Sequence, residues 1–266
     1  MSPDPAIAAA AMKLLHARLK DHDGLFVLGI CGAQGSGKST LAQTLVTQMN
    51  GQGVRAAVLS LDDIYLTLAE RSQLAREVHP LLATRGVPGS HDVGLGLSLL
   101  ASMERDERIL LPVFDKANDD RASVDRWHPV PAGCRVMVFE GWCLGARPQP
   151  EVALGEPAND LERDEDPGGV WRRWVNAQLA GDYQRLFSRI DALIMLAAPS
   201  FAVVRDWRWQ QERDLEQSSV AVMNETGIAR FIQFYQRLTE WMLDEMPAHA
   251  DLVVRLDERR WALRIG

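Results

Sequence analysis

Short apolar runs recur along this chain at intervals typical of buried strands in a parallel sheet. Each run is rich in Val, Ile, Leu or Ala and lacks the strict polar alternation of a strand with one wet face. The five runs are residues 25–31, 55–61, 135–140, 191–197 and 251–257. They predict a mainly parallel five-stranded sheet that is covered on both faces.

The segments between these runs carry apolar residues at helical spacing. The clearest helical patterns are residues 39–49, 94–103, 171–189, 201–217 and 229–245, and a further amphipathic helix is expected from residue 6. Alternating strands and helices predict an α/β fold of three layers (α/β/α) in a single domain of 266 residues. Ligands of such sheets bind at the carboxyl ends of the strands, so polar residues just after each strand are the candidates for a site.

Two stretches interrupt the alternation. Residues 85–131 are rich in Gly, Pro, Asp and Arg and contain one clear helical pattern, which indicates a functional insertion rather than a plain connection. Residues 148–169 are acidic and rich in Pro and Gly, which predicts a solvated surface loop.

The most specific motif follows the first apolar run and reads GAQGSGKST. It is the G-x-x-x-x-G-K-[ST] phosphate-binding P-loop, in which glycines let backbone N–H groups surround a phosphate and the next helix adds its positive end. Its residues are Gly32, Ala33, Gln34, Gly35, Ser36, Gly37, Lys38, Ser39 and Thr40. Lys38 is expected to reach the β- and γ-phosphates and Ser39 to bind Mg²⁺. The base-reading N-K-x-D motif of GTPases is absent, so the expected cofactors are ATP and Mg²⁺.

Carboxylates follow the second and third apolar runs. Asp62 and Asp63 lie at the expected sheet edge, and because successive side chains of an extended segment alternate, only one should face the site. We favour Asp62 as a general base or Mg²⁺ ligand; the alternative is that both residues cap the next helix. Glu140 is expected on the Mg²⁺ side, with a structural role in accepting backbone N–H groups as the alternative.

Cations and hydrogen-bonding residues elsewhere complete the candidate site. Arg205 and Arg208 are three residues apart on the expected helix 201–217 and should share a face, either as a lid that closes over the phosphates or as an exposed pair. The candidates for binding a small acidic acceptor, besides Asp62, are Tyr65, Arg85, His91, Asp92, Lys116 and Arg121. Two roles remain open for His91: it could act as a catalytic base, or it could be a hydrogen-bonded structural residue.

Charge and composition narrow the partners. A net charge of −7 argues against a broad nucleic-acid-binding surface. The sequence contains no run of 18 uncharged apolar residues, so it predicts no membrane-spanning helix. Three scattered cysteines, Cys31, Cys134 and Cys143, are too few for a disulfide framework and are expected as thiols in the cytoplasm. The expected partner is a small molecule, and the sequence does not predict an oligomeric state.

With these residues in place, the chain resembles the plant-type D-glycerate 3-kinase family, which is related to uridine kinase, phosphoribulokinase and bacterial pantothenate kinase. The matching stretches are GAQGSGKST, LSLDDIYLT, RGVPGSHD, LPVFDKANDDR, VFEGWCLGARP and the WRWQQE helix, in the family's order. The resemblance implies transfer of the ATP γ-phosphoryl group to D-glycerate, giving 3-phosphoglycerate. It implies Asp62 as the base, Glu140 beside Mg²⁺, and Arg85, Lys116 or Arg121 as the cation for the substrate carboxylate.

Two other functions remain open on the sequence. One is a kinase for a different small hydroxylated acceptor, such as a nucleoside or a pantothenate-like compound. The other is an ATP-binding regulatory protein that uses the same fold without transferring phosphate, because a fold does not fix a function.

Overall fold

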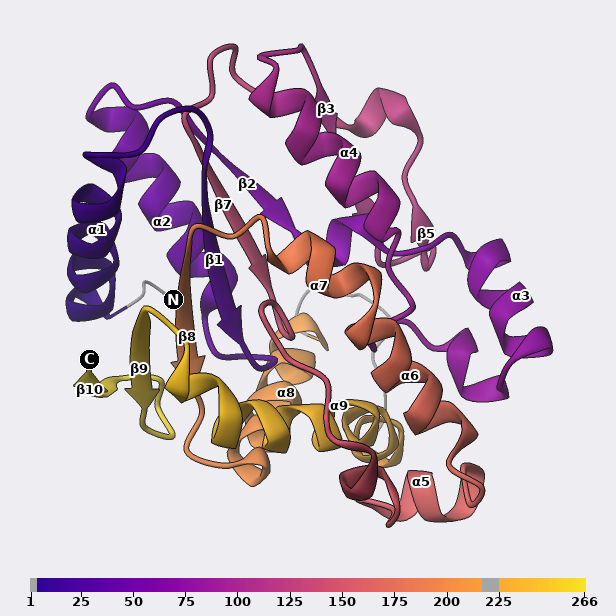
Figure 1. The fold of residues 1–266 in the computed structure, drawn as a ribbon. Coiled ribbons are helices and arrows are strands. Elements are labelled where there is room, and N and C mark those ends of the chain that lie inside the picture. The colour runs from indigo at the N-terminus through magenta and orange to yellow at the C-terminus, as the bar shows by residue number, and fades with distance from the viewer. Residues whose placement is uncertain (1–3, 217–224) are drawn as a thin grey trace.

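The centre of the molecule is a six-stranded sheet in the order β10-β9-β8-β1-β7-β2 (Figure 1). The computed structural model describes residues 4–216 and 225–266, so residue 217, the expected end of the lid-like helix, lies outside the described residues. The strands are β1 (Phe26–Gly32), β2 (Ala56–Ser60), β7 (Val136–Gly141), β8 (Ala192–Ala197), β9 (Leu252–Leu256) and β10 (Ala262–Ile265). The first five are parallel and coincide with the five apolar runs.

The sixth strand, β10, is a correction to the predicted strand count. It pairs antiparallel with β9 at one edge of the sheet. Its side chains are half-buried or exposed, and Leu263 is 71% exposed. An edge strand of this kind buries no continuous apolar run, so the pattern that identified the other strands does not mark it.

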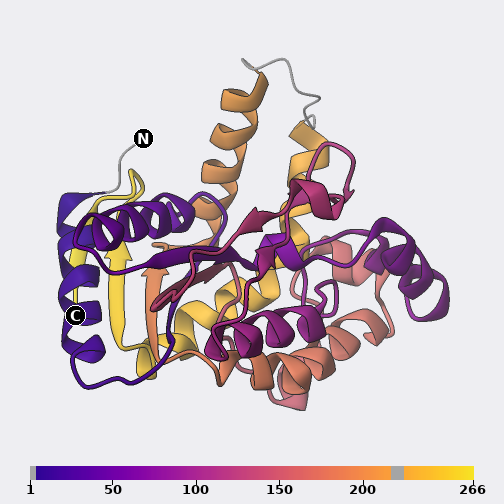
Figure 2. The ribbon, with the colours of Figure 1, turned by 90° about the horizontal axis from the view of Figure 1, so that it is seen from above.

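Helices cover both faces of the sheet, as Figure 2 shows. Their bounds are α1 (Pro5–Leu19), α2 (Lys38–Gly51), α3 (Leu68–Glu77), α4 (Val93–Glu104), α5 (Asp160–Glu165), α6 (Val170–Ala180), α7 (Asp182–Phe187), α8 (Phe201–Glu216) and α9 (Glu225–Glu245). Helices α1 and α2 bury one face of the sheet, and α4, α6, α7 and α9 bury the other. The three-layer α/β prediction is thereby confirmed. No helix among the described residues is long and apolar enough to cross a bilayer.

Two helical predictions need correction. The pattern at 171–189 is not one helix, because the chain breaks at Gly181 into α6 and α7. Helix α3 lacks an apolar stripe and was not predicted, although Thr67 and Glu70 form a complete capping box at its start. Only Arg71 of this helix is buried.

The insertion at 85–131 holds one α-helix, α4, together with two short antiparallel strand pairs. The first pair is β3 (Leu110–Leu111) with β6 (His128–Pro129), and the second is β4 (Phe114–Asp115) with β5 (Asp120–Arg121). The β4–β5 hairpin lies next to the carboxyl end of β2, because the backbone N–H of Phe114 donates to Asp63 (3.0 Å). The insertion is therefore folded against the edge of the sheet where the candidate site residues lie.

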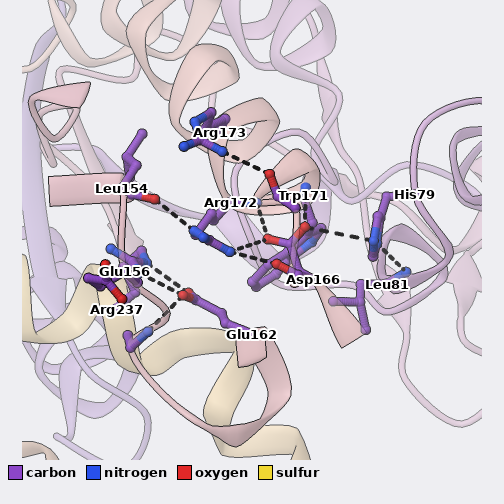
Figure 3. Close-up of polar contacts among 12 residues, drawn as sticks. His79, Leu81, Leu154, Glu156, Glu162, Asp166, Trp171, Arg172, Arg173 and Arg237 are labelled. Atoms are coloured by element: carbon purple, nitrogen blue, oxygen red, sulfur yellow. Dashed lines mark hydrogen bonds and ion pairs between the residues drawn. The ribbon is translucent and has the colours of Figure 1, made fainter. Parts of the chain in front are cut away.

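The prediction of a solvated loop at 148–169 is wrong. This segment contains α5, and two of its acidic side chains are buried in an ion-pair network (Figure 3). Glu162 receives two hydrogen bonds from Arg237, at 2.7 and 2.6 Å. Asp166 pairs with Arg172 at 3.1 Å and also accepts the backbone N–H of Trp171. Composition suggested solvation, but Glu162 finds its partner 75 residues away, and Asp166 finds its partner just beyond the acidic segment, six residues on.

Replacing Arg237 should destabilise the fold strongly. Arg237→Met leaves the Glu162 carboxylate buried without its cation, so we expect a loss of about 3 kcal/mol in the free energy of unfolding, measured by urea denaturation. Arg163→Met is the matched control, because Arg163 pairs with Asp160 at the surface of the same segment. It should cost less than about 0.5 kcal/mol. Equal losses in the two variants would contradict the importance of the buried pair.

Candidate active site

The phosphate-binding loop joins the buried strand β1 to helix α2. Gly35 and Gly37 have φ angles of +77° and +90°, a left-handed conformation that favours glycine. A Cβ at Gly35 would lie 2.6 Å from Cβ of Trp207, so the loop also needs glycine for close packing against α8. A Cβ at Gly37 would meet open space. The loop thus presents an uncovered turn and the N-terminal end of α2, which fits a phosphate group.

Glu140 links this loop to the neighbouring strand. It lies near the carboxyl end of β7, is 4% exposed, and accepts hydrogen bonds through Oε1 from the hydroxyls of Ser39 and Ser60, both at 2.9 Å. Its other oxygen, Oε2, is buried and has no hydrogen-bond partner in the structure. Protein sites for Mg²⁺ commonly supply one or two oxygen ligands and leave the rest to phosphate and water. Ser39 and Glu140 therefore fit the expected metal position.

The two aspartates after β2 point to different partners. Asp62 Oδ2 lies 2.9 Å from Nζ of Lys116, and Asp62 Oδ1 accepts a hydrogen bond from the hydroxyl of Tyr65 at 3.0 Å. Asp63 instead accepts the backbone N–H of Phe114. Neither aspartate caps the turn at Leu61–Ile64, because Ser60 provides that cap. The two side chains do separate as expected, with Asp62 facing the cations, but they do so from the 3-10 turn Leu61–Ile64 and not from an extended segment.

The surroundings of Asp62 and Asp63 shift the pKa values of the two carboxyl groups in opposite directions. Burial raises the pKa of Asp62, but the charges of Lys116 and Lys38 and the hydrogen bond from Lys116 outweigh burial and hold that pKa at about 2. Burial raises the pKa of Asp63 to about 6, although the N–H of Phe114 lowers it; the nearby charge of Asp62 raises it further. Asp62 is accordingly the carboxylate that is fully ionised at neutral pH.

His91 has a buried, hydrogen-bonded position. Its ring stacks on Tyr65 with 4.5 Å between ring centroids, and its Nδ1 lies 2.6 Å from the hydroxyl of Tyr183. Burial lowers the pKa of His91 to about 3, so the imidazole is neutral at physiological pH. These contacts favour the structural role over that of a base and help to hold Tyr65 beside Asp62.

Each of the three acceptor-site cations has an acidic partner. Arg121 contacts Asp92 at 3.1 Å, and Arg85 contacts Asp119. Lys116 differs because its partner is the candidate base, Asp62.

The sequence analysis missed Arg71 on this side of the site. Arg71 is fully buried, pairs with Asp119 at 3.0 Å, and lies over the ring of Phe114. A single arginine in a polar helix carries no signal in the sequence that would identify this role.

The structure separates the two lid candidates on α8. Arg205 is 60% exposed and lies beside Asp206, whereas the Arg208 guanidinium lies over the ring of Phe231 on α9, 5.3 Å from its centroid. The charge of Arg208 also acts on Tyr235, another residue that the sequence analysis missed. Helix α8 packs against α9, and in Figure 2 α8 and the beginning of α9 project to the same side of the molecule, whereas the rest of α9 runs along the sheet.

Tyr235 on α9 connects this helix to the first residues of the insertion, and together they form one wall of the candidate site. Its hydroxyl donates to the backbone oxygen of Arg85 at 3.2 Å, and its ring packs edge-on against Trp142. Because Gly86 has a φ of +135° and a Cβ there would lie 2.0 Å from the Tyr235 hydroxyl, this wall requires glycine in the RGVPGSHD segment. The long apolar spacing of α9 predicts a helix but does not show which of its residues reaches this wall.

The raised pKa of Asp63 predicts a dependence of stability on pH. The folded protein keeps the Asp63 proton up to about pH 6, whereas the unfolded chain releases it near pH 4, so this residue costs stability as the pH rises between those values. Asp63→Asn removes the cost and keeps an oxygen for the N–H of Phe114. In urea denaturation, the difference in free energy of unfolding between this variant and wild type should grow by about 1–2 kcal/mol in favour of the variant as the pH rises from 4 to 7. A difference that stays constant with pH would contradict the assignment.

Comparison with known proteins identifies the family. Residues 2–65 match the family profile described as Methylmalonyl Co-A mutase-associated GTPase MeaB, which covers the P-loop part alone. An uncharacterised kinase of Schizosaccharomyces pombe is 34% identical over 244 residues, covering 88% of this chain and 87% of that protein. The chloroplastic D-glycerate 3-kinase of Arabidopsis thaliana is 28% identical over 268 residues, covering 93% of this chain and 56% of the plant protein.

A solved structure extends the match to the whole fold. The D-glycerate 3-kinase of Cryptococcus neoformans var. grubii superposes with a TM-score of 0.82 at 25% identity and covers 98% of both chains. These relatives confirm the resemblance noted in the sequence and the assignment as an ATP-dependent phosphotransferase. The chain belongs to the D-glycerate 3-kinase family of P-loop small-molecule kinases.

Proposed function

We propose that this protein transfers the γ-phosphoryl group of ATP to D-glycerate and forms 3-phosphoglycerate. The observation that carries the proposal is Asp62, an ionised carboxylate at the carboxyl edge of the sheet with the ammonium of Lys116 at 2.9 Å. A base beside a cation suits an acceptor that carries both a hydroxyl and a carboxylate. The names of the plant and fungal relatives support D-glycerate as that acceptor.

In this mechanism the chain holds and orients the reacting groups. Residues 32–40 hold the phosphates, and Lys38 contributes its charge at the β- and γ-phosphates. Ser39 and Glu140 would hold Mg²⁺, which neutralises phosphate oxygens when it is bound. Asp62 accepts the hydrogen bond of the glycerate hydroxyl and orients it towards the γ-phosphorus. It takes the hydroxyl proton as the new oxygen–phosphorus bond forms and the bond from the γ-phosphorus to the bridging oxygen breaks, which releases ADP.

We assign the acceptor site to the insertion 85–131 and the lid to α8, within a single kinase domain. The contacts of the β4–β5 hairpin support this assignment, because Arg121 donates to the backbone oxygen of Tyr65 (2.9 Å) and to Asp92. Tyr65 in turn donates to Asp62. The insertion thereby connects to the proposed base through two hydrogen bonds.

The cysteines support a reducing compartment such as the cytoplasm. Cys31, Cys134 and Cys143 are free thiols, and Cys31 and Cys143 are buried. Burial raises the pKa of Cys31 to about 12, so its thiol stays protonated and unreactive.

Replacing the proposed base should abolish transfer. Asp62→Asn removes proton acceptance, so we expect a fall of at least about 100-fold in turnover with MgATP and D-glycerate. A coupled ADP-release assay measures the rate, and phosphorus NMR identifies the product. Asp63→Asn, the matched control, should keep turnover close to wild type.

Two results would count against this function. Near-full turnover of Asp62→Asn would exclude Asp62 as the base. If wild-type protein binds ATP but releases no ADP with D-glycerate, the acceptor is a different one, and a panel of nucleosides and pantothenate-like compounds is the next test.

The lid arginines should differ in their effect on catalysis. Arg208 lies over Phe231 and acts electrostatically on Tyr235, so it is the better placed of the two to stabilise charge on the transferring phosphoryl group. We expect Arg208→Met to lower kcat about 100-fold and Arg205→Met to change it by less than about threefold. Thermal denaturation of both variants checks that the fold is kept. Equal losses of kcat would contradict the distinction.

A further inference from the structure

The proposed base, Asp62, forms an ion pair with a lysine from the insertion. Lys116 Nζ lies 2.9 Å from Oδ2 of Asp62, and the hydroxyl of Tyr65 occupies Oδ1. The Lys116 side chain is 64% exposed and that of Asp62 is 33% exposed, so the ion pair lies at the solvent side of the site. An acceptor hydroxyl that hydrogen-bonds to Oδ2 must share or take the place of Lys116.

The backbone around Lys116 is held firmly. The N–H of Phe114 donates to Asp63 at one strand of the hairpin, and Arg121 is tied to Tyr65 and Asp92 at the other. The turn between them folds around Asp115, which accepts the backbone N–H groups of residues 117 and 118 and pairs with Arg126 at 2.6 Å. Movement at this position is therefore left to the flexible side chain of Lys116.

The other two cations of the insertion have different partners. Arg85 is held by Asp119, a carboxylate that also binds the buried Arg71, and Arg121 is held by Asp92. Neither of these carboxylates is the one that the reaction needs. Lys116 alone among the three candidates is paired with Asp62, and a lysine ammonium leaves one carboxylate for another more readily than a bidentate guanidinium.

We propose that Lys116 masks Asp62 until a hydroxy acid binds. The carboxylate of the acceptor then pairs with the Lys116 ammonium, and the hydroxyl of the acceptor forms a hydrogen bond to the Asp62 oxygen that Lys116 has left. This inference rests on the proposed function, because it assigns Asp62 as the base. A neutral polyol offers no anion to Lys116 and leaves the mask in place. The exchange therefore selects hydroxy acids over neutral polyols.

The same mask protects ATP from water. When Oδ2 of Asp62 is unoccupied, a water molecule can donate a hydrogen bond to it, attack the γ-phosphorus and pass its proton to Asp62. The bond from the γ-phosphorus to the bridging oxygen then breaks, and ADP and phosphate leave. With Lys116 on Oδ2, a water molecule must compete with the ammonium for that oxygen and meets a less basic carboxylate.

Kinetics of Lys116→Met test this proposal, with Lys116→Arg retaining the charge. Arg105→Met is the control, because it removes a cation of the insertion that pairs with Glu107 at the surface. We expect Lys116→Met to raise KM for D-glycerate about 10- to 100-fold, the effect of losing one charge-assisted hydrogen bond. The preference for D-glycerate over glycerol in kcat/KM should fall by a similar factor. ATP hydrolysis without any acceptor should rise severalfold, whereas Arg105→Met should match wild type in all three measurements.

The outcomes separate the mask from the proposed function. Equal losses with D-glycerate and glycerol, together with unchanged acceptor-free hydrolysis in Lys116→Met, would overturn the masking role and leave Lys116 as a structural support. Restored KM and preference in Lys116→Arg would support the role of the charge. A wild-type protein that is inactive with D-glycerate would instead overturn the proposed function, and acceptor-free hydrolysis by Lys116→Met would still test the mask.

Discussion

The carboxylate of Glu140 is the contact on which the arrangement of the site depends. One oxygen accepts the hydroxyls of Ser39 and Ser60, which ties the first turn of α2 to the end of β2 across the central strand β7. Strand order explains why this is possible, because β7 lies between β1 and β2. The phosphate loop and the turn with Asp62 are thus linked by one buried side chain, whose other oxygen is buried and has no hydrogen-bond partner.

The acceptor side of the site is built by a different means. Its cations lie on the insertion and on helix α3, and three carboxylates contact them: Asp119 binds both Arg71 and Arg85, Asp92 binds Arg121, and Asp62 binds Lys116. Such pairs position long side chains without committing the protein to an uncompensated buried charge. Because one of these carboxylates is the proposed base, charge pairing and catalysis share the same residue, and the low pKa of Asp62 follows from that arrangement.

Residues with a local signal were predictable, and residues with distant partners were not. Buried parallel strands show as apolar runs, and the P-loop is a contiguous motif, so the layers and the phosphate site follow from the sequence. Strand β10 and helix α3 bury too little apolar surface to show a period. Glu162 looked solvated because its partner, Arg237, is 75 residues away. Asp166 looked solvated although Arg172 is only six residues on, because an acidic composition does not show that the pair is buried. Tyr235 reaches the acceptor wall from a helix 150 residues after Arg85.

The contacts of Trp207 within α8 restrict how the proposed lid could move. Trp207 is 2% exposed, lies against Gly35 of the phosphate loop, and donates through its indole N–H to the backbone oxygen of Glu258 at 2.7 Å. Arg260 lies over the same indole and donates to the backbone oxygen of Gly35. A swing of the whole helix would break these contacts and disturb the loop that binds phosphate. The proposed lid would therefore close through side chains on either side of Trp207, and Arg208 is adjacent to this anchor.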